Sequence, residues 1–437
     1  MSSQLRAWCA LALLVGAFCL TRVAQGQGPA STADVPTISV LTFGPGDETF
    51  SKFGHDALWV HDPRQPASRR DLVYNYGTFR FDSPWLIVDF LKGRLSYWLS
   101  VSSLQRTLAV YRTANRSVRA QELALSPEQA LALTAFVVEN AKPENAAYRY
   151  DYYRDNCATR IRDVLDRHLG GGLQAASTGP AQWTYRDHTR RLTAGAPVLL
   201  FALDLALGPL IDRPISEWEE MFLPGRVEAK LAQLKLADGR PLVRRARSLF
   251  EARRAPEPER PPGFRWGWLG AGVAIGAALW GLGRLGRAWS RVAFAAAVGA
   301  IGALGGVLGG LLLVLWLLTD HEVTYFNQNV LLCPVWGLAL PLLARDLARA
   351  APRRLRATYA LLGAAALAAL AALVLRALLP HSQHTGPALA FFVPQWLAAA
   401  LAVRSRVASA APALAHAGRG DGPSEARADG ASLEADE

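Results

Sequence analysis

Five apolar stretches in the last third of the chain decide what this protein can fold into. They cover about residues 266–283, 292–318, 325–344, 357–379 and 388–403. A helix needs about 20 apolar residues to cross a hydrocarbon core of about 30 Å. Each stretch is therefore predicted to span a membrane, although the third and fifth are short. The first two thirds have the mixed composition of a soluble domain, so a soluble domain joined to a five-helix membrane domain is expected.

Basic residues indicate how these helices cross the membrane. Arginines follow the first, third and fifth stretches, at 284, 287, 291, 345, 349, 353, 354, 356, 404 and 406. Loops rich in Lys and Arg stay in the cytoplasm, which places the soluble domain outside. These loops also account for much of the net charge of +11. Because no nucleic-acid-reading motif accompanies that charge, we expect no nucleic acid partner.

The N-terminus has the features of a secretory signal peptide over residues 1–26. Arg6 precedes an apolar run over residues 7–20, and small residues allow cleavage after Ala24 or Gly26. An uncleaved anchor is the alternative. The Pro-rich run 256–262 predicts a stiff linker. The expected domains are thus 27–262 outside the cell, 263–406 in the membrane and a disordered tail over 407–437.

The exported part has signals for both strands and helices. Residues 37–43, 57–60, 71–77 and 119–125 are predicted strands, and alternation places Val73 and Asn75 on one face of the third. Ser126 followed by Pro127 predicts the start of a helix that ends near residue 141. An α+β domain is expected.

Cys157 is the residue in this domain that most strongly indicates chemistry. Cys9 and Cys19 lie in the signal segment and Cys333 in an apolar stretch, which leaves Cys157 unpaired in an oxidising compartment. Asp155 or Asn156 is predicted to cap the helix that begins here. The unpaired N–H groups of a helix start favour a thiolate, so a nucleophile is expected. A buried, inert cysteine is the alternative.

A thiol nucleophile needs a base, and His55 at the start of the second strand is the candidate. Asn75 on the neighbouring strand is predicted to orient the His55 ring, with Asp71 and Asp56 as alternatives. The N–H of Cys157 and the side chain of Asn156 are predicted to bind an oxyanion.

Two polar loops are expected on the outer face of the membrane domain. One contains Asp320, His321, Asn327 and Asn329, and the other covers residues 380–384. They are either solvated loops or part of a site for a lipid headgroup or acceptor. A metal held by Asp320, His321, His381 and His384 lacks the dense spacing of a metal site, so no metal or cofactor is expected.

Several motifs resemble the Lnb family of bacterial lipoprotein N-acyltransferases. They are residues 54–57 (Gly-His-Asp-Ala), 73–79, 150–160 with Asp-Asn-Cys-Ala-Thr-Arg, 218–224, and the loop with Asp320, His321, Asn327 and Asn329. The resemblance implies a periplasmic papain-like thiol domain in permuted order, similar to NlpC-like proteins, followed by five membrane helices. It also implies that Cys157 and His55 are catalytic. Asp56 departs from the small residue common at this position in the family.

The expected function is that of a multi-pass protein of the bacterial inner membrane with its site in the periplasm. A phospholipid would donate an acyl chain to Cys157, and a diacylated lipoprotein would accept it at its N-terminal amine. A cell-wall cysteine peptidase or amidase is one alternative, because the same residue pair serves that chemistry. A non-catalytic membrane scaffold is another.

Overall fold

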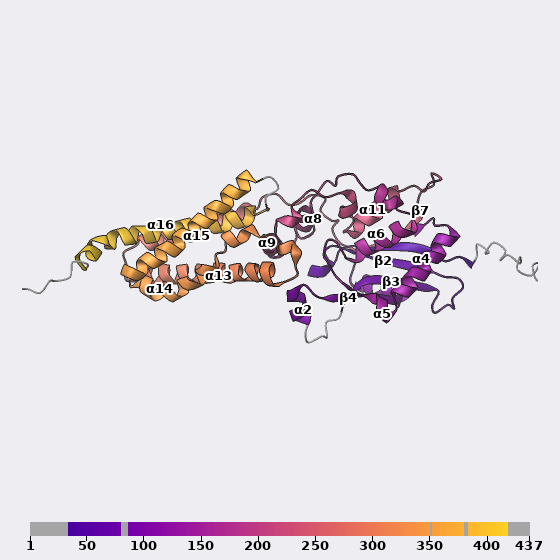
Figure 1. The fold of residues 1–437 in the computed structure, drawn as a ribbon, viewed down its shortest axis with the longest axis horizontal. Helices are drawn as coiled ribbons and strands as arrows, with labels where there is room; N and C mark the ends of the chain where they lie inside the picture. The colour runs from indigo at the N-terminus through magenta and orange to yellow at the C-terminus, as the bar shows by residue number, and fades with distance from the viewer. Residues whose placement is uncertain (1–33, 80–85, 350–351, 380–382, 418–437) are drawn as a thin grey trace, which may run out of the picture. The chain divides into compact units, whose positions relative to one another are not determined.

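The computed structural model describes residues 34–79, 86–349, 352–379 and 383–417 (Figure 1). The predicted signal peptide therefore lies outside the described residues. The chain divides into two compact units, each described below by itself. The first unit comprises residues Met1–Phe81, Ser96–Pro180 and Ser216–Pro256, and the second comprises Asp82–Leu95, Ala181–Ile215 and Glu257–Glu437.

The first unit is built on a seven-stranded antiparallel sheet with strand order β6-β4-β3-β2-β1-β5-β7. Its strands are β1 (Thr37–Phe43), β2 (His55–His61), β3 (Asp71–Thr78), β4 (Ser96–Ser103), β5 (Val118–Leu123), β6 (Ala147–Arg149) and β7 (Val243–Phe250). The first three and β5 were predicted. The ladder between β1 and β2 pairs Thr37 with His61 and Phe43 with His55.

Alternation along the strands creates two apolar layers. On one face Leu58, Tyr74 and Tyr76 join a core with helices of the same unit, and on the other Trp59 and Val73 join a second core. The predicted opposite orientation of Val73 and Tyr74 is thus confirmed. Each side of the sheet is covered, which fixes the register of the central strands.

Helices α4, α6 and α11, labelled in Figure 1, pack on the first face. Helix α3 packs on the second face. The helices of this unit are η2 (Thr49–Ser51), α3 (Leu104–Thr113), α4 (Pro127–Asn140), α5 (Pro143–Ala146), α6 (Cys157–His168), α7 (Gly172–Ala175), α10 (Glu217–Glu220) and α11 (Pro224–Gln233). Ser126 is the N-cap of α4, at the predicted start of the helix, and it forms a capping box with Gln129.

Three strands, β4, β6 and β7, were not predicted from the sequence. Tyr97 and Trp98, at the end of an aromatic run over 84–98, lie in β4 and pack against the core of the sheet. Trp85 lies outside the described residues. The basic strand β7 is an edge strand with largely exposed side chains, so its pairing with β5 depends on the backbone and leaves no apolar alternation to detect.

The second unit contains five segments long and apolar enough to cross a membrane: Trp266–Arg284, Ala288–Leu318, Gln328–Ala348, Arg354–Leu378 and Gly386–Ala408. All five predicted spans are confirmed by length and composition. The elements of this unit are α2 (Leu86–Lys92), α8 (Tyr185–Leu192), α9 (Pro197–Ala206), η3 (Pro209–Ile211), α12 (Trp266–Arg284), α13 (Ala288–Leu318), η4 (Glu322–Thr324), η5 (Gln328–Leu331), η6 (Val335–Ala339), α14 (Leu340–Ala348), α15 (Pro352–Leu378) and α16 (Gly386–Ala417).

Small residues allow these helices to approach closely. A Cβ at Gly276 of α12 would lie 2.8 Å from the carbonyl oxygen of Pro394 in α16. The third span is irregular because Pro334 and Pro341 lack the N–H that a continuous helix requires, so η5 and η6 precede α14. The last helix continues to Ala417, whereas the sequence predicted a disordered tail from residue 407. The Ala-rich composition of this segment explains the longer helix.

Candidate functional site

Asn156 caps the start of α6. Of the two predicted caps, Asp155 and Asn156, the structure therefore has the second. Its Oδ1 accepts hydrogen bonds from the N–H groups of Ala158 (2.9 Å) and Thr159 (3.0 Å). Its Nδ2 donates to the carbonyl oxygens of Tyr152 (2.9 Å) and Phe222 (3.0 Å). Both ends of the amide are therefore bound to backbone, and the capping geometry places the buried Cys157 as the first residue of α6.

His55 contacts Asn75, as predicted, at the start of β2. The Nε2 of His55 and the Oδ1 of Asn75 form a short hydrogen bond. Because an amide oxygen only accepts, Nε2 carries the proton and Nδ1 is left as the base. The Nδ2 of Asn75 donates to Oγ1 of Thr78 at 3.4 Å, which is consistent with this amide orientation.

Cys157 and His55 both lie next to Gly77, although they are far apart in the sequence. A Cβ built on Gly77 would lie 3.6 Å from Cε1 of His55 and 3.7 Å from Cβ of Cys157, and 3.8 Å from the hydroxyl of Tyr148. Gly77 has a φ of +91°, which non-glycine residues rarely adopt. A residue without a side chain thus allows three reactive groups to converge. Neither Gly77 nor Tyr148 was identified as a site residue from the sequence.

Burial dominates the electrostatics of the pair. It raises the pKa of Cys157, although the N–H groups of Asp56, Ala158 and Cys157 itself act in the opposite direction. The thiolate expected from the helix start is therefore disfavoured, because desolvation outweighs these N–H groups. Burial also lowers the pKa of His55 to about 4, and the hydrogen bond that His55 donates to Asn75 raises the pKa to a smaller extent. The resting pair is a neutral thiol beside a neutral imidazole.

Asp71 and Asp56, the two alternative carboxylates, do not orient the His55 ring in this structure. Asp71 accepts a hydrogen bond from Nε1 of Trp59 (2.9 Å) and contacts Nδ1 of His61 (2.8 Å). Its histidine partner is therefore His61 and not His55. Asp56 is fully buried, and desolvation raises its pKa well above the usual value, with the nearby Cys157 adding to the effect. A neutral Asp56 avoids a buried negative charge next to the thiol.

Asn156 and Asp155 differ from the roles expected of them. The amide of Asn156 is occupied by backbone groups on both sides, so it is not available to bind an oxyanion. Asp155 accepts two hydrogen bonds from Arg160, at 2.5 and 2.6 Å. The guanidinium of Arg160 in turn lies 3.9 Å from the centre of the Tyr148 ring.

In the second unit, Asn327 and Asn329 cap a helix. The last carbonyls of α9 have no partner within the helix. The Nδ2 of Asn327 donates to the carbonyls of Leu205 and Ala206, both at 2.9 Å. The Nδ2 of Asn329 donates to those of Leu205 (2.9 Å) and Asp204 (3.1 Å). This is a structural role, and the acceptor-site role expected for both residues stays a prediction.

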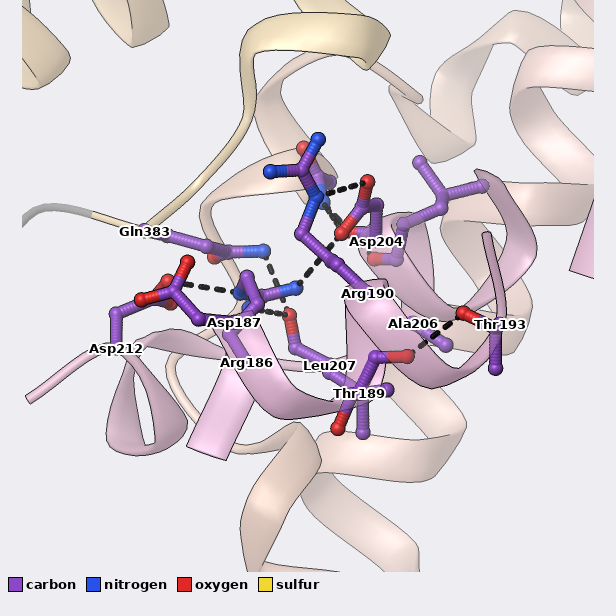
Figure 2. A network of polar contacts seen from close by, with 12 residues as sticks. Arg186, Asp187, Thr189, Arg190, Thr193, Asp204, Ala206, Leu207, Asp212 and Gln383 are labelled. Atoms are coloured by element: carbon purple, nitrogen blue, oxygen red, sulfur yellow. Dashed lines mark hydrogen bonds and ion pairs between the residues drawn. The ribbon is translucent and has the colours of Figure 1, made fainter. Parts of the chain in front are cut away.

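Further polar side chains bind the carbonyls at the C-terminal end of α9 and just after it (Figure 2). Arg186 donates to Asp212 (2.8 Å) and to the carbonyls of Leu207 (2.8 Å) and Gly208 (2.9 Å). Gln383 donates to the carbonyl of Leu207 at 2.8 Å. These contacts join residues 186–212 to the loop before α16.

Asp320 and His321 pack against the end of α2. Asp320 forms an ion pair with Arg94 at 2.7 Å, and its N–H donates to the carbonyl of Lys92 at 2.9 Å. A Cβ at Gly93 would lie 3.0 Å from the backbone nitrogen of His321. No group of three metal-ligating side chains occurs among the described residues, and His381 lies outside them.

This geometry defines a class of protein. A buried cysteine and a partly buried histidine are brought together in an α+β domain, and the chain continues into five helices capable of spanning a membrane, so it is a multi-pass membrane protein. Residues 30–191 match the family of the Lnb N-terminal periplasmic domain. This match supports the resemblance to the Lnb family seen in the motifs of this region. No curated protein and no solved structure matches the chain.

Proposed function

We propose that this protein is a lipoprotein N-acyltransferase of the bacterial inner membrane, with its site in the periplasm. The observation that carries the proposal is the convergence of Cys157 and His55 at Gly77 in an Lnb domain. The five apolar helices support it, because both substrates are lipids anchored in a bilayer. The arginine-rich loops support an orientation with the Lnb domain outside the cytoplasm.

The reaction has two acyl transfers. In the first, Nδ1 of His55 takes the thiol proton as Sγ of Cys157 attacks an ester carbonyl of a phospholipid, which leaves a thioester and an alcohol. In the second, the α-amine of a diacylated lipoprotein attacks the thioester carbonyl, and His55 accepts the amine proton. The C–S bond then breaks to leave the amide, and His55 returns the proton to Sγ of Cys157, which restores the neutral thiol. Asn75 holds the imidazole with Nε2 protonated throughout. No metal or cofactor is needed for either step.

The neutral resting pair supports this order of events. Because the pKa of the thiol is raised and that of His55 is lowered, the thiol loses its proton only as the new bond forms. A protonated thiol is also less prone to oxidation in the periplasm than a free thiolate. We further propose that the domain is papain-like in permuted order, since the histidine strand precedes the cysteine helix.

Replacement of Cys157 tests the proposal. In cells that depend on this protein for lipoprotein N-acylation, Cys157→Ala should abolish the third acyl chain in mass spectra of lipoprotein N-termini. The purified wild-type protein incubated with phosphatidylethanolamine vesicles should gain the mass of one acyl chain on Cys157. N-acylation that continues in the Cys157→Ala strain would disprove the acyl-carrier role.

A cysteine peptidase or amidase of the cell wall is the second candidate, because the same Cys–His pair serves acyl transfer from amides. The membrane-spanning helices argue against it, since a soluble cell-wall substrate does not require them. Labelling of Cys157 by a peptide probe but not by a lipid would favour this alternative. A thiol that neither probe labels would favour a non-catalytic scaffold.

A further inference from the structure

A buried hydroxyl without a partner lies at the point where the cysteine and histidine meet. Tyr148 of β6 is 9% exposed, and among the described residues no group forms a hydrogen bond with its hydroxyl. A buried polar group in this state costs free energy unless another partner is supplied. The hydroxyl lies 3.8 Å from the Cβ position of Gly77, to which Cys157 and His55 also come within 3.7 Å.

The ring of Tyr148 is held by residues on either side of the nucleophile in the sequence. Arg160 stacks its guanidinium on the ring at 3.9 Å, and Asp155 fixes that guanidinium through two hydrogen bonds of 2.5 and 2.6 Å. A cation on the ring face withdraws electron density from the phenol and makes its O–H a stronger donor. The helix start that presents Cys157 thus also orients Tyr148.

We propose that Tyr148 is a catalytic residue whose O–H donates to the oxyanion formed at Cys157. The N–H of Cys157 is the second donor, because the cap of Asn156 takes up the N–H groups of Ala158 and Thr159 but not that of Cys157. This inference rests on the acyl transfer proposed above. It replaces the predicted role of the Asn156 side chain.

The step conserves its atoms and charges. The Sγ–C bond forms as the thiol proton moves to Nδ1 of His55, and the carbonyl π electrons move onto oxygen, where Tyr148 and the Cys157 N–H bind the charge. When the oxyanion collapses, the C–O bond to the leaving alcohol breaks and the imidazolium returns the proton to that alcohol. Tyr148 keeps its own proton, and burial raises the pKa of Tyr148, which is consistent with a donor that does not ionise.

Two reactions of the Cys157 thiol show whether Tyr148 stabilises an oxyanion or instead alters the reactivity of the thiol in general. p-Nitrophenyl butyrate acylates the thiol through a tetrahedral oxyanion, whereas iodoacetamide alkylates it by displacement without one. In the full-length protein in detergent, Tyr148→Phe should slow acylation by about 10²- to 10³-fold, the usual loss for one oxyanion donor. The rate of alkylation should stay within about twofold of the wild type.

Tyr76→Phe is the matched control, because it removes another buried hydroxyl, which donates to Asn140 at 2.6 Å. It should leave both rates unchanged. Arg160→Gln should reproduce part of the acylation defect, again without an effect on alkylation. An equal fall of both rates in Tyr148→Phe, or no change in either, would overturn the role of Tyr148. Wild-type protein that is alkylated but never acylated, by the ester or by phospholipid vesicles, would instead refute the proposed function, and with it this inference.

Discussion

The pH dependence of acylation tests the electrostatics of the site most directly. Burial lowers the pKa of His55 to about 4, with a smaller effect of Arg116 in the same direction and opposing effects of Asn75 and Asp56. The base is active only when neutral. At pH 5, a pKa of about 4 leaves roughly 90% of His55 neutral, whereas the ordinary value of 6.5 would leave roughly 3%. The two cases differ by about 30-fold in rate.

The measurement is the acylation rate of Cys157 by p-nitrophenyl butyrate at low substrate concentration, which reports the pKa values of the free enzyme. The rate should be nearly constant from pH 7.5 to pH 5 and fall by half near pH 4. Cys157→Ala provides the background of spontaneous hydrolysis at each pH. A half-point near pH 6.5 would show that His55 is hydrated in solution and would refute the argument from burial.

Two substitutions test the remaining parts of the site. Asn75→Leu removes the acceptor that fixes Nε2–H of His55, so acylation should fall by about 10²- to 10⁴-fold. Asn75→Asp should retain activity and move the acidic side of the pH–rate profile to higher pH. Equal activity of both variants would contradict the orienting role. Gly77→Ala imposes a side chain at a φ of +91° and should cost about 1–2 kcal/mol of stability. Its methyl group would also touch Cys157, His55 and Tyr148, so acylation should be lost, and a wild-type rate would show that substrate does not approach there.

Local signals in the sequence were sufficient for much of the fold. The capping box at Ser126, the alternation in β3 and the apolar length of the five spans each depend on residues close together in the chain. Strand β7 could not be predicted in this way because its pairing with β5 uses the backbone of a basic segment. The third span was predicted by composition, but its 3₁₀ segments depend on how the chain packs around Pro334 and Pro341.

The site was predictable only in its most exceptional residues. A lone cysteine at a helix start and a histidine at a strand start stand out in the sequence, and the contact between His55 and Asn75 follows from neighbouring strands. The protonation of the pair could not be predicted, because desolvation depends on the packing of the whole domain. Tyr148 was hidden among several tyrosines of one aromatic run, and only its unpaired hydroxyl separates it from them.

The capping of α9 has a consequence for how the protein can be produced. The carbonyls of residues 204–207 accept hydrogen bonds from Asn327, Asn329 and Gln383, all of which follow the Pro-rich linker at 256–262. A chain shortened at that linker would expose these carbonyls and the apolar face of α9, together with residues 181–215 that share the second unit. Soluble fragments intended for crystallisation or screening should therefore omit or redesign this segment, because the linker in the sequence is not the boundary of the folded unit.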